Sequence, residues 1–237
     1  MKRTIFALLC ALAMLLPCAP RAYAAGADNA AQAAIVVHPE TGTVLYEKNA
    51  DARLGIASTT KIMTALVVLE HCALGEPVEI LPEYTAVEGS SMYLRAGETY
   101  TVEELLYGMM LVSGNDAALA LACHTAGSVQ AFADMMNDKA RALGMTGSAF
   151  QNPNGLMRGA LFHGARHGGA HLCGMANDTF CTIVATERAT IGGQTLVNHN
   201  RLLRCYDARS ASRPATRRRP GARLCPVHSA ARRALSA

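Results

Sequence analysis

The sequence has no tryptophan and few aromatic residues of any kind: Phe, Tyr and Trp together make up 5% of its 237 residues. Lysine is also scarce and occurs only at Lys2, Lys48, Lys61 and Lys139. Hydrophobic residues nevertheless account for 51% of the chain and charged residues for 17%. That balance excludes a disordered chain and a collagen-like repeat, and the length is sufficient for a domain with its own hydrophobic core.

Acidic residues are missing from the C-terminal segment. Residues 208–237 contain eight Arg and no Asp or Glu, whereas residues 25–207 hold 11 basic and 18 acidic side chains, a net charge of −7. The overall net charge of +4 therefore describes neither part. An acidic body argues against a nucleic-acid partner. The Arg-rich segment predicts a disordered tail, and the alternative is an arm for anionic polymers or membrane surfaces.

The N-terminus has the layout of a secretory signal. Basic residues precede an apolar run over residues 5–16, and a small-x-small sequence ends at Ala24. Twelve apolar residues are too few to span a bilayer comfortably. We therefore expect a signal peptide over residues 1–24 and an exported protein, periplasmic or at the outer face of the membrane. The alternatives are an uncleaved anchor and a lipoprotein modified at Cys18.

Cysteine spacing gives no disulfide framework. Six Cys remain after the expected cleavage, with no CxxC pair and no regular spacing. Cys72 and Cys123 fall in apolar helical stretches, where free thiols are ordinary. We expect free thiols, although an exported compartment permits disulfides.

Three histidines, His163, His167 and His171, recur at a spacing of four residues, which on a helix suits zinc. The glycines around them make that helix poor, and no carboxylate is close in sequence to orient the imidazoles. No metal site is therefore expected there.

The body of the chain reads as a hairpin followed by a helical block. The hairpin is expected from two β-prone runs around a turn sequence, and the helices from apolar periodicity and capping residues. In chain order the expected elements are strands 34–37 and 43–46, a helix from Ser58 to near Gly75, a helix from Thr101 with a capping box at Glu104, helices 116–125 and 128–143, and strands 181–186 and 195–197 around a Gly192-Gly193 turn.

The first motif, Ser58-Thr59-Thr60-Lys61, places a hydroxyl and an amine three residues apart at the start of a predicted helix. Side chains at that spacing lie on one face, about one turn apart. A helix N-terminus favours negative charge on the Ser58 oxygen and disfavours protonation of a nearby ammonium. A partly buried Lys61 with a lowered pKa is then able to accept the Ser58 proton. The alternative is a capped amphipathic helix with a surface lysine.

The second motif, Ser113-Gly114-Asn115, separates two apolar helical stretches. A glycine lets the backbone turn sharply and present both polar side chains to one cavity. We expect Ser113 to relay a proton to a leaving group and Asn115 to hydrogen-bond a substrate amide. The alternative is a plain helix junction with a capping Ser or Asn.

Together the two motifs resemble those of the serine-type D-alanyl-D-alanine carboxypeptidases, the low-molecular-weight penicillin-binding proteins of peptidase family S11. Other parts of the family pattern follow in the same order, at residues 57–65, 95–98, 111–118, 150–156 and 198–203. The resemblance covers about residues 30–156 and 175–207. It implies an α+β, β-lactamase/transpeptidase-like fold, with an antiparallel sheet, a helical cluster beside it and the cleft between them.

The resemblance also implies an acyl-enzyme mechanism on a peptidoglycan stem peptide ending in D-Ala-D-Ala. Ser58 is then the nucleophile, Lys61 the general base and Ser113 a proton relay, while Asn115 binds substrate. β-Lactams are expected to acylate the same serine, and no cofactor is implied.

The family's third motif, a Lys-Thr-Gly on a strand lining the cleft, is missing, because no Lys follows Lys139. Arginine is not a simple replacement for that lysine. We therefore expect an incomplete sheet at the C-terminal side and impaired activity. The alternatives are a non-catalytic module that binds peptidoglycan or penicillin and a β-lactamase-like hydrolase.

The domain organisation expected from these patterns is a catalytic domain over residues 25–207 followed by the tail 208–237. Within the domain, residues 157–174 are an atypical, insert-like stretch, rich in Gly, His, Arg and Ala. The family pattern is lost over residues 157–174, returns, and is lost again after residue 207. This alternation suggests reading-frame slips, a hypothesis that places the disruption in the C-terminal part. The membrane-associating helix typical of the family is not found in this chain.

Overall fold

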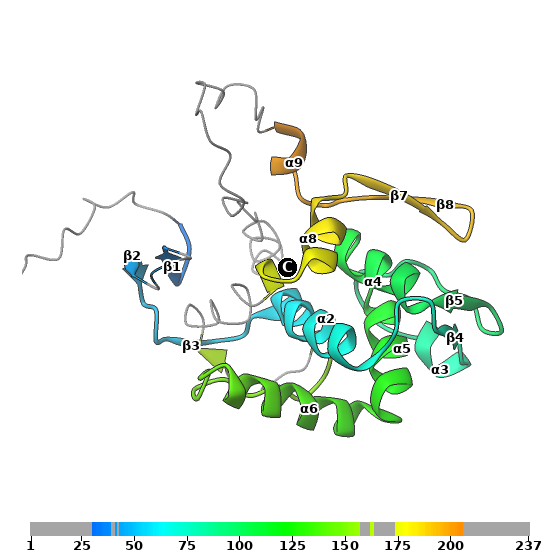
Figure 1. Ribbon diagram of the computed structural model, residues 1–237, viewed down its shortest axis with the longest axis horizontal. Helices are drawn as coiled ribbons and strands as arrows, with labels where there is room; N and C mark the ends of the chain where they lie inside the picture. Colours follow the sequence, from blue (N-terminus) through cyan, green and yellow to red (C-terminus); the bar gives the residue numbers. More distant parts are fainter. Residues whose placement is uncertain (1–29, 39–40, 42, 157–161, 164–173, 206–237) are drawn as a thin grey trace, which may run out of the picture.

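The computed structural model describes residues 30–38, 41, 43–156, 162–163 and 174–205. In this part of the chain, helices form the centre and short antiparallel strand pairs lie around them (Figure 1). The expected signal peptide 1–24, the tail 208–237 and most of the atypical stretch 157–174 lie outside the described residues, so these expectations stay predictions.

The elements follow one another as a hairpin, a helical block and a second hairpin. The helical elements are η1 (Ala57–Thr59), α2 (Thr60–His71), α3 (Pro82–Thr85), α4 (Val102–Leu111), α5 (Asn115–Ala126), α6 (Val129–Ala142), α8 (Asp178–Ala185) and α9 (Leu202–Cys205). The strands are β1 (Ala34–Val37), β2 (Val44–Lys48), β3 (Arg53–Leu54), β4 (Pro77–Glu79), β5 (Thr99–Thr101), β6 (Phe162–His163), β7 (Arg188–Ile191) and β8 (Gln194–Val197).

The expected α+β fold is confirmed, and the sheet takes the form of separate ribbons. Within the described ranges the strands pair antiparallel as β1–β2, β3–β6, β4–β5 and β7–β8, each a two-stranded sheet. The predicted N-terminal hairpin is β1–β2, with Ala34 opposite Lys48. Pairing of β3 with β6 ties two residues of the atypical stretch to the segment just before η1.

Helix ends lie where the capping residues predicted them. Thr101 and Glu104 form the capping box of α4: Thr101 Oγ1 accepts from the Glu104 N–H at 3.2 Å, and Glu104 Oε2 accepts from the Thr101 N–H at 2.8 Å. Gly127 ends α5 in a left-handed conformation, with φ of +76°. Ser128 Oγ caps α6 by accepting from the Ala131 N–H at 3.2 Å. Each cap satisfies a backbone group that the helix leaves unpaired.

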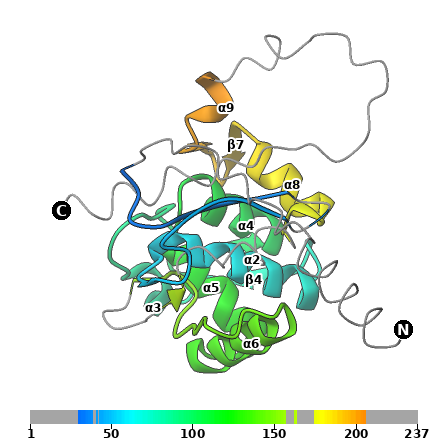
Figure 2. The same ribbon diagram turned by 90° about the vertical axis from the view of Figure 1, so that its left-hand side faces the viewer.

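The core lies where α2, α4 and α5 pack together, with α6 across one side (Figures 1 and 2). Alanines on α5 allow the helices to approach closely, and larger side chains from α2 and α4 fill the space around them. Buried side chains include Met63, Leu66, Val67 and Val68 of α2, Leu105, Leu106 and Met109 of α4, and Ala117, Ala118, Leu121 and Ala122 of α5. This packing holds the N-terminal ends of α2 and α5 in fixed relation.

The predicted strand 181–186 is wrong, because most of it lies in α8. Asn177 caps this helix by accepting from the Phe180 N–H at 2.9 Å, and α8 buries Phe180, Cys181 and Ile183. Packing against α4 overrides the β preference of the branched residues. The partner of β8 is instead β7, and the expected Gly192-Gly193 turn joins them, with φ of +54° and +75°.

Cys72, Cys123 and Cys181 are free thiols, as expected for the first two. In the ranges that the structure describes, every helix is too short or too polar to cross a bilayer.

Candidate active site

Ser58 lies in the single 3₁₀ turn η1, which leads directly into α2. Two bonds to the Ile56 carbonyl close this turn, one from the Thr59 N–H at 3.1 Å and one from Thr59 Oγ1 at 2.6 Å. Ala57 has φ of +44°, a conformation that costs energy for a residue with a side chain. Held in this way, Ser58 is half-buried and its hydroxyl reaches Lys61.

A turn built around Asn152 packs against the back of η1. Asn152 Oδ1 accepts from the Gly155 N–H at 2.6 Å, and Thr64 Oγ1 of α2 donates to the Pro153 carbonyl at 2.7 Å. Gly155 has φ of +80°, and a Cβ there would lie 2.1 Å from the Ala57 carbonyl oxygen. Only glycine permits this approach, so the turn supports the backbone of the serine turn from behind.

Gly155→Ala is therefore expected to displace η1. We expect a loss of about 1–3 kcal/mol in the free energy of unfolding and a fall of roughly tenfold or more in the acylation rate, because small displacements of reacting groups are costly. Urea unfolding and the rate of labelling by fluorescent penicillin measure the two effects. Gly127→Ala is the matched control, with φ of +76° and no atom within 4 Å of the added Cβ. Equal effects of both variants on acylation would contradict the supporting role.

Ser113 reaches Lys61 because the chain between α4 and α5 turns through a left-handed residue. Ser113 itself has φ of +61°. The N–H groups of Val112 and Gly114 both donate to the Gly108 carbonyl, at 3.4 and 3.2 Å, and so bend the chain back over the end of α4. Strain of this kind persists only where surrounding contacts enforce it, and it concentrates at functional sites.

Lys61 is the centre of the polar cluster and is only 2% exposed. Its Nζ lies 3.2 Å from Ser58 Oγ, 3.3 Å from Ser113 Oγ and 2.6 Å from Asn115 Oδ1. Desolvation by burial lowers the pKa of Lys61 to about 8, against the opposing effect of the Asp116 charge. An amine with this pKa is partly neutral near neutral pH and is able to take a proton from a hydroxyl.

Asn115 is buried and joins Lys61 to the loop between α3 and β5. Its Oδ1 accepts from Lys61, its Nδ2 donates to the Glu88 carbonyl at 2.7 Å, and its backbone N–H donates to the Ser90 carbonyl at 2.8 Å. These bonds orient the amide, and the amide in turn fixes the position of the amine.

Asp116, the next residue, is fully buried at 0% exposed. Its carboxylate accepts from Ser91 Oγ at 2.5 Å and from the backbone N–H groups of Met92, Leu94 and Ala117 at 3.0, 3.1 and 2.9 Å. Several hydrogen bonds compensate the desolvation of a buried carboxylate. Asp116 therefore fixes the loop beside the polar cluster and supplies it with a nearby negative charge.

Asp116→Asn is expected to lower the free energy of unfolding by about 2–3 kcal/mol, because an amide group then faces backbone donors. Removal of the charge also removes the effect that raises the pKa of Lys61. The midpoint of the pH–acylation profile should therefore move below about 8. Asp134→Asn on the exposed face of α6 is the control, and an unchanged midpoint in Asp116→Asn would contradict the electrostatic role.

A hollow of about 360 Å³ lies next to the Ser113 turn. Its walls are the loop 89–93, Val112, residues 194–196 of β8 and His199. The backbone N–H of His199 donates to the Leu111 carbonyl at 2.9 Å, which ties the end of the β7–β8 hairpin to α4. None of the four predicted site residues lines this hollow, and its link to the cluster is Val112, the residue before Ser113.

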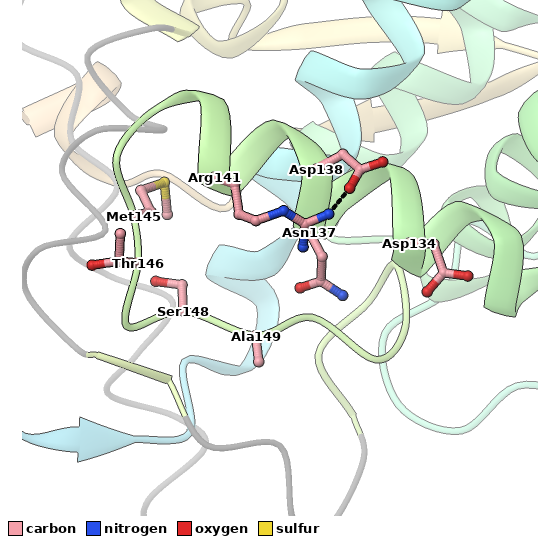
Figure 3. Close-up of a pocket in the computed structure, with 8 residues that line it drawn as sticks. All are labelled: Asp134, Asn137, Asp138, Arg141, Met145, Thr146, Ser148 and Ala149. Atoms are coloured by element: carbon pink, nitrogen blue, oxygen red, sulfur yellow. Dashed lines mark hydrogen bonds and ion pairs between the residues drawn. The ribbon is translucent and has the colours of Figure 1, made fainter.

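A second hollow, of about 460 Å³, lies between α6 and the segment after it (Figure 3). Three of its polar side chains are already engaged: Asp138 pairs with Arg141, and the Asn137 amide bonds both backbone groups of Phe150. Its lining belongs to α6 and to residues 145–149, and it includes no residue of the turns that carry Ser58 and Ser113 or of their sequence neighbours, so it is not the candidate active site.

The structure brings all four predicted site residues, Ser58, Lys61, Ser113 and Asn115, into one hydrogen-bonded cluster. Sequence reasoning assigned no role to Asp116 or Gly155. The signal for Asp116 was a carboxylate in the first turn of an otherwise apolar helix, because burial of an unpaired carboxylate is costly. The cluster contains hydroxyls, an amine and an amide. These functional groups suit a nucleophile with its base better than a metal site.

A family model for peptidase S11, described as D-alanyl-D-alanine carboxypeptidase, matches residues 20–205. The D-alanyl-D-alanine carboxypeptidase DacF of Bacillus subtilis strain 168 is 39% identical over 168 residues, which are 66% of this chain and 43% of DacF. The D-alanyl-D-alanine carboxypeptidase of Streptomyces sp. strain K15 is 40% identical over 163 residues, 63% of this chain and 56% of its own. The chain thus spans about half the length of the curated relatives it matches.

Solved structures give the same result for the fold. The D-alanyl-D-alanine carboxypeptidase from Mycobacterium tuberculosis superposes with a TM-score of 0.70 at 33% identity, covering 74% of this chain and 69% of its own. A single-residue mutant of the Streptomyces K15 DD-transpeptidase gives a TM-score of 0.71 at 37% identity, covering 76% of this chain and 78% of its own.

Proposed function

This chain belongs to the peptidase S11 family of D-alanyl-D-alanine carboxypeptidases, and we propose that it removes the terminal D-Ala of peptidoglycan stem peptides through an acyl-enzyme on Ser58. One observation carries the proposal. The desolvated amine of Lys61 lies within hydrogen-bond distance of both the Ser58 and the Ser113 hydroxyls. A neutral amine between two hydroxyls is able to take a proton from one and pass it through the other.

In the proposed acylation step, Ser58 Oγ attacks the carbonyl carbon between the two D-alanines and gives its proton to Lys61 Nζ. The tetrahedral intermediate carries an oxyanion, for which the Ser58 backbone N–H is one donor. Collapse breaks the C–N bond, and the proton passes from Lys61 through Ser113 to the amine of the leaving D-Ala. Water then hydrolyses the ester and returns the proton to Ser58.

Substrate binding is proposed for the hollow beside Ser113. A carboxamide nitrogen has two N–H groups, and Asn115 uses one of them for the Glu88 carbonyl. The second is proposed to donate to a backbone carbonyl of the stem peptide. The loop 89–93 and the β7–β8 hairpin then flank the peptide on either side.

Turnover is proposed to be slow. The sequence contains no Lys-Thr-Gly to hold the terminal carboxylate of the substrate. Loss of such an anchor removes binding energy used for orientation but leaves the nucleophile and its base in place. We therefore expect acylation by a β-lactam, which is already reactive, and little release of D-Ala.

Export is part of the proposal. S11 carboxypeptidases act on peptidoglycan outside the cytoplasm, and residues 1–24 have the layout of a signal peptide. The proposed cleavage after Ala24 leaves an acidic mature body.

The proposal is tested by incubating the purified chain with fluorescent penicillin, digesting it and locating the adduct by mass spectrometry. The expected result is a single penicilloyl group on the peptide that contains Ser58. An adduct on another residue, or no adduct, would overturn the acyl-enzyme. D-Ala release from a stem pentapeptide then measures turnover.

The absence of the third motif favours one second candidate, a non-catalytic module that binds stem peptides. That function predicts saturable binding of a pentapeptide without a penicillin adduct. A β-lactamase-like hydrolase predicts instead rapid release of hydrolysed penicillin, so one labelling time course separates all three.

A further inference from the structure

Three metal-ligating side chains meet at the ends of α2 and α5 that lie away from the Ser58 cluster. Cys72 Sγ, a Glu76 carboxylate oxygen and a His124 ring nitrogen all lie within 4.8 Å of one another. Cys72 is the C-cap residue of α2, Glu76 lies in the loop just before β4, and His124 lies in the last turn of α5. Among the residues that the structure describes, no other group of three such ligands comes together.

The backbone around these side chains is held in place without a metal. The Cys72 N–H donates to the Val68 carbonyl at 2.9 Å, which continues α2 into the loop. The Glu76 N–H donates to the Ala73 carbonyl at 3.1 Å, and the Glu76 carbonyl accepts from the Val102 N–H at 3.0 Å. A ligand set on a fixed backbone loses little entropy when an ion binds.

The two oxygens of the Glu76 carboxylate have different partners. Its Oε1 accepts from the Ala73 N–H at 2.6 Å, while Oε2 lies 3.1 Å from His124 Nε2. The Ala73 bond and then the His124 bond lower the pKa of Glu76, so the group is ionised. Oε2 and Nε2 are thus two ligand atoms at the separation expected between neighbouring ligands of a tetrahedral ion, about 3.3 Å for bonds near 2.0 Å.

Cys72 carries its proton in the metal-free state. Thr125 Oγ1 donates its hydrogen to the Leu121 carbonyl at 2.7 Å and is therefore left to accept from the Cys72 thiol at 3.3 Å. Burial raises the pKa of Cys72. An ion that binds the sulfur displaces this proton to solvent, as thiolate coordination requires.

We propose that Cys72, Glu76 and His124 form a Zn²⁺ site, with the sulfur, one carboxylate oxygen and one imidazole nitrogen as ligands and water in the fourth position. Mixed sulfur, nitrogen and oxygen ligands in a tetrahedral arrangement suit Zn²⁺ better than Mg²⁺ or Ca²⁺, which require oxygen. On binding, a Zn–S bond replaces the Cys72 S–H bond and one proton is released. Zinc also needs the lone pair of His124 Nε2, so the proton that Nε2 donates to Glu76 leaves this nitrogen and passes by way of solvent to Nδ1, which carries the imidazole proton in the bound state.

The site is structural rather than catalytic. Both α2 and α5 have 12 residues, so the ion lies about 18 Å along the helices from the Ser58 cluster. It connects the far ends of the two helices whose near ends carry Lys61 and Asn115. An occupied site stabilises this pairing, as any ligand of the native state does.

The probe is Co²⁺, titrated into the reduced, EDTA-treated full chain and followed by absorption. The expected result is a thiolate-to-cobalt charge-transfer band with the visible bands of a tetrahedral ion, removed by one equivalent of Zn²⁺. Cys72→Ser should lose the charge-transfer band, and His124→Gln and Glu76→Gln should weaken binding at least roughly tenfold. Zn²⁺ should raise the melting temperature of the wild type and not that of Cys72→Ser.

Cys123→Ser and His71→Gln are the matched controls, because both residues neighbour the cluster in sequence without belonging to it. Melting in EDTA shows whether each variant is folded. If Cys72→Ser is not folded, the loss of metal binding is read from His124→Gln, because His124 is exposed. Absence of the charge-transfer band in the wild type, or its persistence in a folded Cys72→Ser, overturns the proposal. Penicillin labelling is read separately, so failure of the zinc site leaves the acyl-enzyme proposal untouched.

Discussion

Replacement of Ser58 by Ala is expected to abolish covalent labelling by penicillin while the melting temperature changes little. Ala lacks the oxygen that forms the ester, and the Ser113 hydroxyl does not take its place, since a strained turn of its own holds it at Lys61. The turn η1 is closed by Thr59 rather than by the Ser58 side chain. The fold therefore does not depend on the missing oxygen.

The matched control for this loss is Ser128→Ala. Ser128 Oγ caps α6, so its removal should cost about 1 kcal/mol of stability and leave labelling unchanged. Gel fluorescence after incubation with penicillin measures the adduct in both variants. Residual labelling in Ser58→Ala above the background of heat-denatured chain would mean that another residue is acylated.

Sequence alone predicted the elements whose ends carry a chemical signal. The capping box at Thr101 and Glu104, the glycine at Gly127 and the cap at Ser128 each specify a local backbone geometry, and the structure has helix ends at all of them. Such signals involve residues within one turn of one another, so they do not depend on the rest of the fold.

The strand predicted over residues 181–186 shows where local signals fail. Thr, Ile and Val favour strands by side-chain shape, but Asn177 provides a helix cap and α4 provides an apolar surface for Phe180 and Ile183. Burial of large side chains outweighs differences in propensity of a few tenths of a kcal/mol. That surface is remote in sequence and was not visible to a periodicity argument.

In the candidate site, too, the contacts between residues close in sequence were predictable and those between distant residues were not. Spacing alone placed Ser58 beside Lys61, because the two lie on one helical turn. The meeting of Lys61 with Ser113, 52 residues away, was an expectation from resemblance and could not be deduced from spacing. The supporting contacts of Gly155 with Ala57 were unpredictable for the same reason, since tertiary packing joins two segments that lie far apart in the sequence.

Lys61→Met is expected to lower the acylation rate by roughly 10³–10⁴-fold, near the upper range for loss of a positioned general base. In the wild type the rate should rise with pH and level off above the pKa of about 8, because only the neutral amine accepts the Ser58 proton. The Lys61→Met variant should lack both the fast acylation and the inflection in its pH profile. Lys61→Arg should be equally slow, since a guanidinium stays charged.

The same pKa makes a prediction about stability that is independent of activity. Lys61 has a pKa of about 8 in the folded chain against 10.5 for the ordinary group, so between these pH values the unfolded chain binds one more proton than the folded chain. The free energy of unfolding should therefore rise with pH across this window, by on the order of 3 kcal/mol. Below pH 8 and above pH 10.5, the contribution of Lys61 to the free energy of unfolding should not change with pH. Urea unfolding of the wild type and Lys61→Met at several pH values isolates the contribution, because all other groups cancel in the difference. If the difference between the two chains did not change with pH, Lys61 would be charged in the folded state, and it would not be the base that activates Ser58.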